Sequence, residues 1–139
     1  MEPCVKLDPT AFVADSDLIE ALEKRASLLT CDEDRVLFNQ GDEPHGLFIL
    51  HSGEAYLTMA GPKGEPVLCM QPFHGSLLGL PAMIGEEPYS LTAQAQKGAR
   101  LSYVTRDDFR LLLAEQPQLP MKILAVLAAE VRAARLALR

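Results

Sequence analysis

The spacing of apolar residues changes twice along the 139-residue chain. Residues 15–29 open with the capping side chain of Asp15 and continue with apolar residues at helical spacing, which predicts a first helix of about three turns. From residue 35 to residue 104, short apolar stretches alternate with polar neighbours between turns that contain Gly or Pro, which predicts antiparallel strands. Two helical segments follow, divided by Pro117 and Pro120.

This order of elements predicts an α+β fold. The short strands and regular turns are typical of a double-stranded β-helix, a jelly-roll-like β-roll, with one N-terminal helix and two C-terminal helices. A single helical turn interrupts the strands, because Pro81 suits the first turn of a helix and Gly85 suits its end. The length suits one domain. We expect residues 1–14 to be an N-terminal tail and residues 15–139 to be that domain.

The last segment, about residues 121–139, carries apolar residues at alternating spacings of three and four. Such spacing places the side chains on one seam of a helix, as in a helical dimer. The seam residues are Leu124, Leu127, Val131, Ala134 and Leu138. We therefore expect a homodimer formed by this dimerisation helix. The alternative, that the helix packs back onto its own barrel, stays open because other apolar residues lie off the seam.

Composition and charge narrow the function classes. The net charge of −6 makes the chain a poor ligand for DNA or RNA, whose binding depends on Lys and Arg. The acidic start lacks an apolar segment behind it, and no apolar run long enough to span a membrane follows. We expect a cytoplasmic protein that contacts neither membrane nor, by itself, nucleic acid. The three cysteines lie far apart, which favours free thiols.

A turn, a buried strand and a second turn follow one another in residues 41–57. Gly41 and Gly53 supply turn conformations that are closed to most residues. This stretch resembles the opening hairpin of cyclic-nucleotide-binding domains, and the resemblance extends from about Val36 to the end of the chain. It implies the sensory half of a regulator similar to the Crp/Fnr transcription regulators, in which ligand occupancy repositions the dimer helix.

The phosphate-binding cassette of that family is degenerate in this sequence. In the family a Gly-Glu pair begins a short helix, and an Arg-Ser or Arg-Thr pair follows; residues 79–93 match this run with Leu80 for the Glu and Tyr89 for the Arg. By resemblance the Glu receives the ribose 2'-hydroxyl and the Arg pairs with the cyclic phosphate, so both charged contacts are missing. The expected ligand-binding residues of the cassette are Gly79, Leu80, Pro81, Ala82, Tyr89 and Ser90.

A cation for the phosphate is also missing from the barrel. Between Arg35 and Lys97 the only basic residue is Lys63, which lies in a turn. The lost contacts predict that cyclic nucleotides bind about 10² to 10⁴ times more weakly than to an intact cassette. Because the resemblance places the last helix over the ligand, Arg132 and Arg135 are the remaining candidates for a ligand-binding cation. Whether Tyr89 closes the pocket or is only a strand-end aromatic is left open.

Two rival functions remain beside a sensor of a small-molecule or nucleotide-like ligand. One is a ligand-free dimeric interaction module. The other is a cupin-type metal protein, suggested by His45, His51, Glu54 and His74. However, His45 and His51 fall at the two ends of one strand, where they cannot chelate as a pair. No catalytic triad or phosphate-loop motif occurs. We expect no enzyme, no cofactor and no metal.

Overall fold

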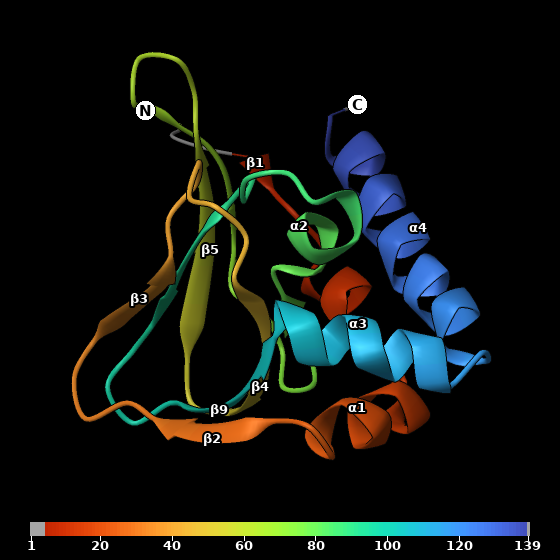
Figure 1. Ribbon diagram of the computed structural model, residues 1–139. Helices are drawn as coiled ribbons and strands as arrows, with labels where there is room; N and C mark the ends of the chain where they lie inside the picture. The colour runs from red at the N-terminus through yellow and green to blue at the C-terminus, as the bar shows by residue number, and fades with distance from the viewer. Residues whose placement is uncertain (1–4, 139) are drawn as a thin grey trace.

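The computed structural model describes residues 5–138 of the chain (Figure 1). Its elements in chain order are β1 (Val5–Lys6), η1 (Pro9–Phe12), α1 (Ser16–Glu23), β2 (Ser27–Thr30), β3 (Arg35–Phe38), β4 (Gly46–Ser52), β5 (Ala55–Ala60), β6 (Pro66–Met70), β7 (Leu77–Leu78), α2 (Leu80–Gly85), β8 (Thr92–Ala95), β9 (Arg100–Thr105), α3 (Arg106–Glu115) and α4 (Leu119–Ala137). The predicted α+β fold class is confirmed.

The strands form two sheets that make up the β-roll. One sheet has the order β1-β6-β5-β8-β3, and the other has the order β2-β9-β4-β7. All neighbours are antiparallel except β1 and β6. Strand β4 is buried along most of its length, because it lies inside its sheet and its side chains fill the roll. In Figure 1 the strands form the left part of the molecule, and the helices lie to their right.

The two C-terminal helices form as the sequence predicts. Thr105 caps α3, since its hydroxyl accepts a hydrogen bond from the Asp108 backbone N–H at 3.1 Å. Helix α4 begins at Leu119, with Pro120 in its first turn, where a missing N–H does no harm. Its Lys122 Nζ lies 2.9 Å from Asp15 Oδ2, the N-cap of α1. Helices α1 and α4 are therefore joined at their N-terminal ends.

The predicted first helix is wrong in its second half. Helix α1 ends at Glu23, and Ser27–Thr30 form strand β2 instead. The reason is tertiary: β2 pairs with β9, with Leu29 opposite Leu101, so the backbone gains ladder hydrogen bonds that a longer helix would not provide. The side chain of Leu28 is exposed on this edge strand.

The segment expected to be a tail is packed onto the domain from residue 5 onward. Strand β1 pairs in parallel with β6, and η1 lies against α4 with Phe12 buried. Its short elements carry too few residues for a periodic pattern, so the sequence did not reveal them. Residues 1–4 lie outside the described part of the chain.

The cysteines differ in state. Cys31 is a buried free thiol, as expected. Cys69 on β6 is disulfide-bonded, so the expectation of free thiols throughout is wrong at this position. Cys4 lies outside the described residues.

Candidate functional site

The cassette begins at a glycine that no other residue can replace without strain. Gly79 is in the left-handed region, with a φ of 98°, and precedes α2. A Cβ at this position would lie 3.0 Å from Tyr89 Cε1 and 3.3 Å from Phe38 Cε2. Helix α2 ends at Gly85, and the Oε1 atom of its C-cap residue, Glu86, lies 2.6 Å from Arg110 Nη2 on α3. The segment that follows Gly79 is thus joined to α3.

Leu80 turns into the protein core. Its side chain is fully buried and packs with the other core residues. It does not line the cavity of the cassette. Leu80 is therefore a packing residue that offers no polar atom to a ligand.

Tyr89 joins the cassette to the start of β4. Its ring stacks on Phe38 with the ring centroids 3.9 Å apart and the planes at 11°. Its hydroxyl donates a hydrogen bond to Gly46 O at 2.6 Å and accepts hydrogen bonds from the backbone N–H groups of Gly46 and His45 at 3.1 and 3.2 Å. The ring of Tyr89 is buried and its hydroxyl is fully bonded, so Tyr89 fixes the cassette segment to the start of β4.

What remains of the pocket is a cavity of about 50 Å³. It lies between η1, the roll, α2 and α4. The described residues that line it are Phe12, Phe38, Leu57, Leu77, Gly79, Pro81, Ala82, Tyr89, Ser90, Leu91 and Glu130. None of these described lining residues is Lys or Arg.

Glu130 is the one carboxyl group in the lining, and the sequence analysis did not select it. Its Oε2 atom is buried and accepts no hydrogen bond from the described residues. Burial raises the pKa of this carboxyl group from its ordinary value of 4.5 to about 8. A signal was present in the sequence: Glu130 continues the buried stripe of α4, which is formed by Ile123, Val126 and Ala133.

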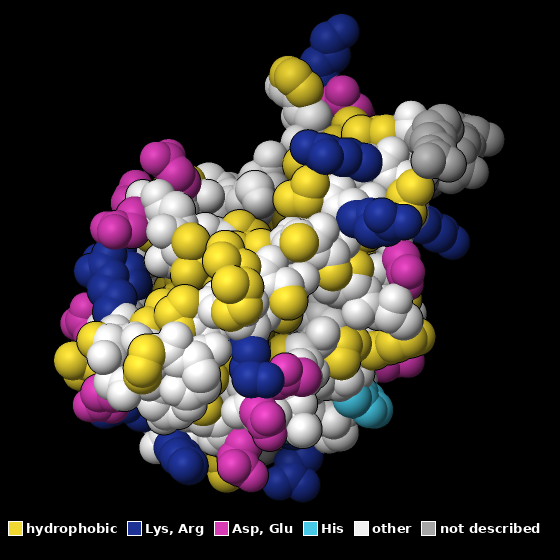
Figure 2. Space-filling view, turned by 90° about the vertical axis from the view of Figure 1, so that its right-hand side faces the viewer, with side chains coloured by type: hydrophobic (Ala, Val, Ile, Leu, Met, Phe, Trp, Pro, Cys, Tyr) yellow, Lys and Arg dark blue, Asp and Glu magenta, His cyan; other side chains and the backbone are white. Residues whose placement is uncertain are grey.

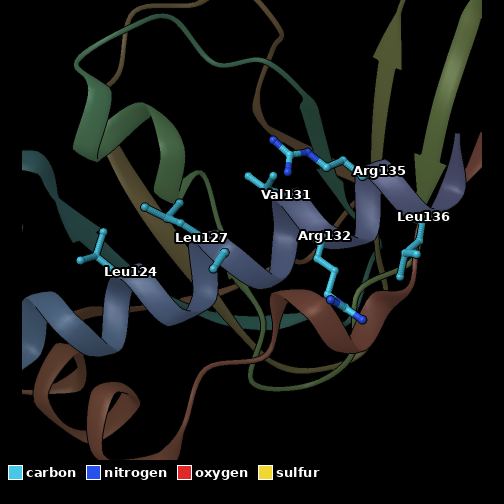
Figure 3. Close-up of a pocket in the computed structure, with 7 residues that line it drawn as sticks. Leu124, Leu127, Val131, Arg132, Arg135 and Leu136 are labelled. Carbon is cyan, nitrogen blue, oxygen red and sulfur yellow. The ribbon is translucent and has the colours of Figure 1, made fainter.

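Arg132 and Arg135 lie elsewhere. Both are exposed, and both line an open groove of about 660 Å³ on the outer side of α4 rather than the cassette cavity. Figure 3 shows Arg132 and Leu136 projecting to one side of the helix, and Val131 and Arg135 to the other. Arg132 also lines a surface hollow beside η1. Within one copy of the described chain, neither arginine contributes to the cassette cavity.

The predicted dimer seam is only partly accessible. Leu124, Val131 and Leu138 are 54%, 48% and 71% exposed, whereas Leu127 and Ala134 pack against the core of their own chain. Met121 is 71% exposed on the same helix. Figure 2, which looks onto the side of the molecule formed by the helices, shows hydrophobic side chains gathered there. The exposed face of α4 is therefore rotated slightly from the predicted seam.

The cupin-like histidines do not converge. The Nδ1 of His45 lies 2.8 Å from Tyr103 Oη, His51 lies beside Glu23, and His74 lines a separate surface pocket with Glu54. Within residues 5–138, no group of three His, Cys, Asp or Glu side chains could hold a metal ion.

One Ser-His-Glu cluster that the sequence did not suggest joins α1 to the roll. His51 Nε2 lies 2.7 Å from both Ser102 Oγ and Glu23 Oε2, and Ser102 Oγ donates to Glu23 Oε1 at 2.7 Å. Serine and carboxylate meet the same ring nitrogen, unlike a catalytic triad, in which they meet opposite nitrogens. Ser102 is also fully buried, so its hydroxyl is not accessible to a substrate. The cluster instead connects α1 to β4 and β9.

No helix within residues 5–138 has both the length and the apolar character needed to cross a membrane.

The fold and the cassette together define a β-roll domain of the ligand-sensing type. A sequence profile described as cyclic nucleotide-binding domain matches residues 28–116, more than half of the chain. The chain therefore belongs to the cyclic nucleotide-binding domain family, and the resemblance found in the sequence is confirmed.

Solved structures share this fold at low sequence identity. The catabolite activator protein of Thermus thermophilus has a TM-score of 0.73 and 23% identity, and the match covers 94% of this chain and 62% of that chain. The sensor domain of the transcriptional regulator DNR from Pseudomonas aeruginosa has a TM-score of 0.65 and 22% identity, covering 82% and 77%. The N-terminal domain of a transcriptional regulator from Streptomyces coelicolor A3(2) has a TM-score of 0.64 and 21% identity, covering 94% and 90%.

Proposed function

We propose that this chain is a regulatory ligand-sensing domain that acts as a homodimer and binds neither cyclic AMP nor cyclic GMP tightly. The regulatory role rests on the family and on relatives that include transcriptional regulators. The observation that supports weak binding of cyclic nucleotides is the small size of the cavity at the cassette. The chain spans only 62% of the length of the Thermus protein. A regulatory role for a whole protein is therefore part of this proposal.

The size of the cavity argues against a cyclic nucleotide. Pockets for ligands of this kind measure about 300 to 1,000 Å³, whereas this cavity measures about 50 Å³. Opening it would require Tyr89 to leave Phe38 and to break three hydrogen bonds with β4 and the residue before it. The free energy of that rearrangement would be subtracted from the free energy of binding.

The charge of the cavity argues in the same direction. A cyclic phosphate needs a positive partner, and the described lining offers none. When Glu130 is ionised, its charge has the same sign as the phosphate, and like charges in a shared buried site repel. Size and charge are independent of each other, so both would have to be wrong for tight binding.

The exposed face of α4 supports the dimer. A helix with an exposed apolar face needs a partner to remove that face from water, and a second copy offers an identical helix. Leu124, Val131 and Leu138 keep the spacing of a helical seam along it. We propose that α4 of one chain packs along α4 of a second copy, within a domain that includes residues 15–139. The predicted cytoplasmic location and the lack of enzymatic activity stay predictions, as does the lack of nucleic-acid binding.

A thermal-shift titration tests the ligand half of this proposal. The chain should show no rise in melting temperature with about 100 μM cyclic AMP or cyclic GMP, because a ligand far below its dissociation constant adds almost no stability. A saturable rise at micromolar concentration would overturn the proposal. Light scattering of the same sample tests the dimer, which should give twice the chain mass.

The small size of the cavity also favours the rival function, a ligand-free dimeric interaction module, because such a module needs no ligand pocket. The two are separated by a wider ligand screen of the dimer, followed by melting temperature. Equal stability with every small molecule tested would favour the interaction module, and a saturable stabilisation would favour the sensor.

A further inference from the structure

The cassette cavity combines three features that can serve a cation. It holds a carboxyl group, Glu130, one of whose oxygens is buried without a hydrogen-bond partner among the described residues. It is walled by the aromatic residues Phe12, Phe38 and Tyr89. Ser90, an exposed residue that carries a hydroxyl group, belongs to the same lining. A hydroxyl and a carboxylate accept hydrogen bonds, and aromatic faces attract cations.

The carboxyl group has no protein cation to pair with. The other residues of the lining, which come from η1, the roll, α2 and the cassette loop, include Tyr89 as their only titratable side chain, and its hydroxyl is already bonded to β4. A buried carboxylate without a partner is costly, so the group either takes up a proton or acquires a positive ligand. The raised pKa of Glu130 favours the first of these outcomes when no cation is bound.

We propose that the cassette cavity is a site for a small primary ammonium group, held by the Glu130 carboxylate, the Ser90 hydroxyl and the aromatic walls. This inference names a ligand class for the site of the proposed function, and it rests on that site being closed to cyclic nucleotides. The site keeps the place of the family's pocket but accepts the opposite charge.

The dimensions limit the ligand to a small head group. A water molecule occupies about 30 Å³ in the liquid, so a cavity of about 50 Å³ admits an ammonium group with roughly one attached carbon. So small a ligand binds in the millimolar range at best, because affinity is limited by the number of heavy atoms. Methylammonium is therefore the appropriate probe, and tetramethylammonium, which is larger and has no N–H donor, is its matched control.

The pairing also predicts how binding depends on pH. Glu130 must lose its proton to bind an ammonium ion, and its pKa is about 8 in the empty cavity. A primary ammonium group keeps its proton to about pH 10.4. Binding should therefore be about tenfold tighter at pH 9 than at pH 7, since the ionised fraction of Glu130 rises by that factor.

An NMR titration of the full chain tests the site. Methylammonium chloride should shift the backbone amide signals of Ser90, Leu91 and Glu130 saturably, with sodium chloride at equal concentration as the baseline. The shifts should grow from pH 7 to pH 9. They should vanish in Glu130→Gln, which keeps the shape of the side chain and removes its charge, and persist in Glu87→Gln, an exposed residue outside the lining.

Two outcomes would overturn the inference: equal shifts in the Glu130→Gln variant, or equal shifts with tetramethylammonium. A parallel titration with cyclic AMP separates this inference from the proposed function. If neither ligand binds, the ammonium site alone is wrong. If cyclic AMP binds tightly, the proposed function is wrong as well.

Discussion

The two faces of helix α4 break the rule of hydrophobic patterning in opposite ways. The inner face packs against the domain through Ile123, Val126 and Ala133, yet it carries Glu130 between them. The outer face is open to solvent, yet it carries Met121, Leu124, Val131 and Leu138.

Each departure from the pattern has a free-energy cost that packing alone does not explain. A charge among apolar residues destabilises the folded chain, and an exposed apolar face loses the benefit of burial. Sequences depart from consistent patterning mainly where function requires it. The inner face thus marks the cavity that we propose for a ligand, and the outer face marks the surface that we propose for a second copy.

The largest expected effect comes from the inner face, in the pH dependence of stability. The pKa of Glu130 is raised to about 8 in the folded chain, so its favourable contribution is full below about pH 4.5 and is lost as the pH rises through about 8. We expect Glu130→Gln to gain stability over the native chain by about 3 kcal/mol between pH 5.5 and pH 8.5, at about 1.36 kcal/mol per pKa unit.

Urea unfolding of both chains at the two pH values measures this difference. Glu87→Gln, which changes an exposed carboxyl group of the same type, should follow the native chain at both. Parallel pH dependence in the native chain and Glu130→Gln would contradict the assignment of Glu130 to a buried, unpaired state.

The outer face gives the next largest effect. Leu124→Glu should dissociate the dimer, because each interface would then bury two unpaired carboxylates; we expect about a hundredfold weaker association. Analytical ultracentrifugation over a concentration series measures it. Leu111→Glu, on the exposed side of α3, changes a leucine of similar exposure and should leave association unchanged. If the native chain is monomeric at micromolar concentration, the outer face of α4 is not a dimer interface and this proposal is wrong.

The sequence predicted the roll better than it predicted the site. Strand β5 alternates buried and exposed residues, and β4 is a continuous run of β-forming apolar residues, so the sequence displays both directly. Strand β2 was missed because Leu29 fits a helical spacing as well as a strand, and only its pairing with Leu101, far along the chain, decides between them.

At the site, the residues with special backbone geometry were predictable and those with tertiary roles were not. Gly79 and Pro81 predict the cassette turn, because glycine can adopt a left-handed backbone conformation and proline suits the first turn of a helix. The bonds from the Tyr89 hydroxyl to the start of β4 depend on how the cassette folds over the roll, which no local pattern encodes. Glu130 was visible in principle, as an acid that continues the buried stripe of α4.

The third effect concerns Tyr89, the residue that closes the inner cavity. Tyr89→Phe keeps the stacking on Phe38 but leaves the Gly46 carbonyl oxygen and N–H without this partner. We expect a loss of about 1 to 3 kcal/mol of unfolding free energy, the usual consequence of an unsatisfied buried polar group. Tyr56→Phe, on the surface of β5, is the control and should change stability by less than about 0.5 kcal/mol. Equal losses in the two variants would show that the hydroxyl of Tyr89 does not hold the cassette closed.

The smallest effect separates a surface carboxylate from the buried one. Glu86 pairs with Arg110 at 2.6 Å, but their side chains are 64% and 45% exposed. Water and salt screen such a pair, so a double-mutant cycle with Glu86→Ala and Arg110→Ala should give a coupling of about 0.2 to 1 kcal/mol. The coupling should shrink in about 1 M salt, where the screening length falls to about 3 Å. The effect of Glu130→Gln should persist in the same salt, because its cause is burial rather than a neighbouring charge. If both effects disappeared together in salt, Glu130 would be a solvated group like Glu86, and the inner face of α4 would lose the feature that distinguishes it.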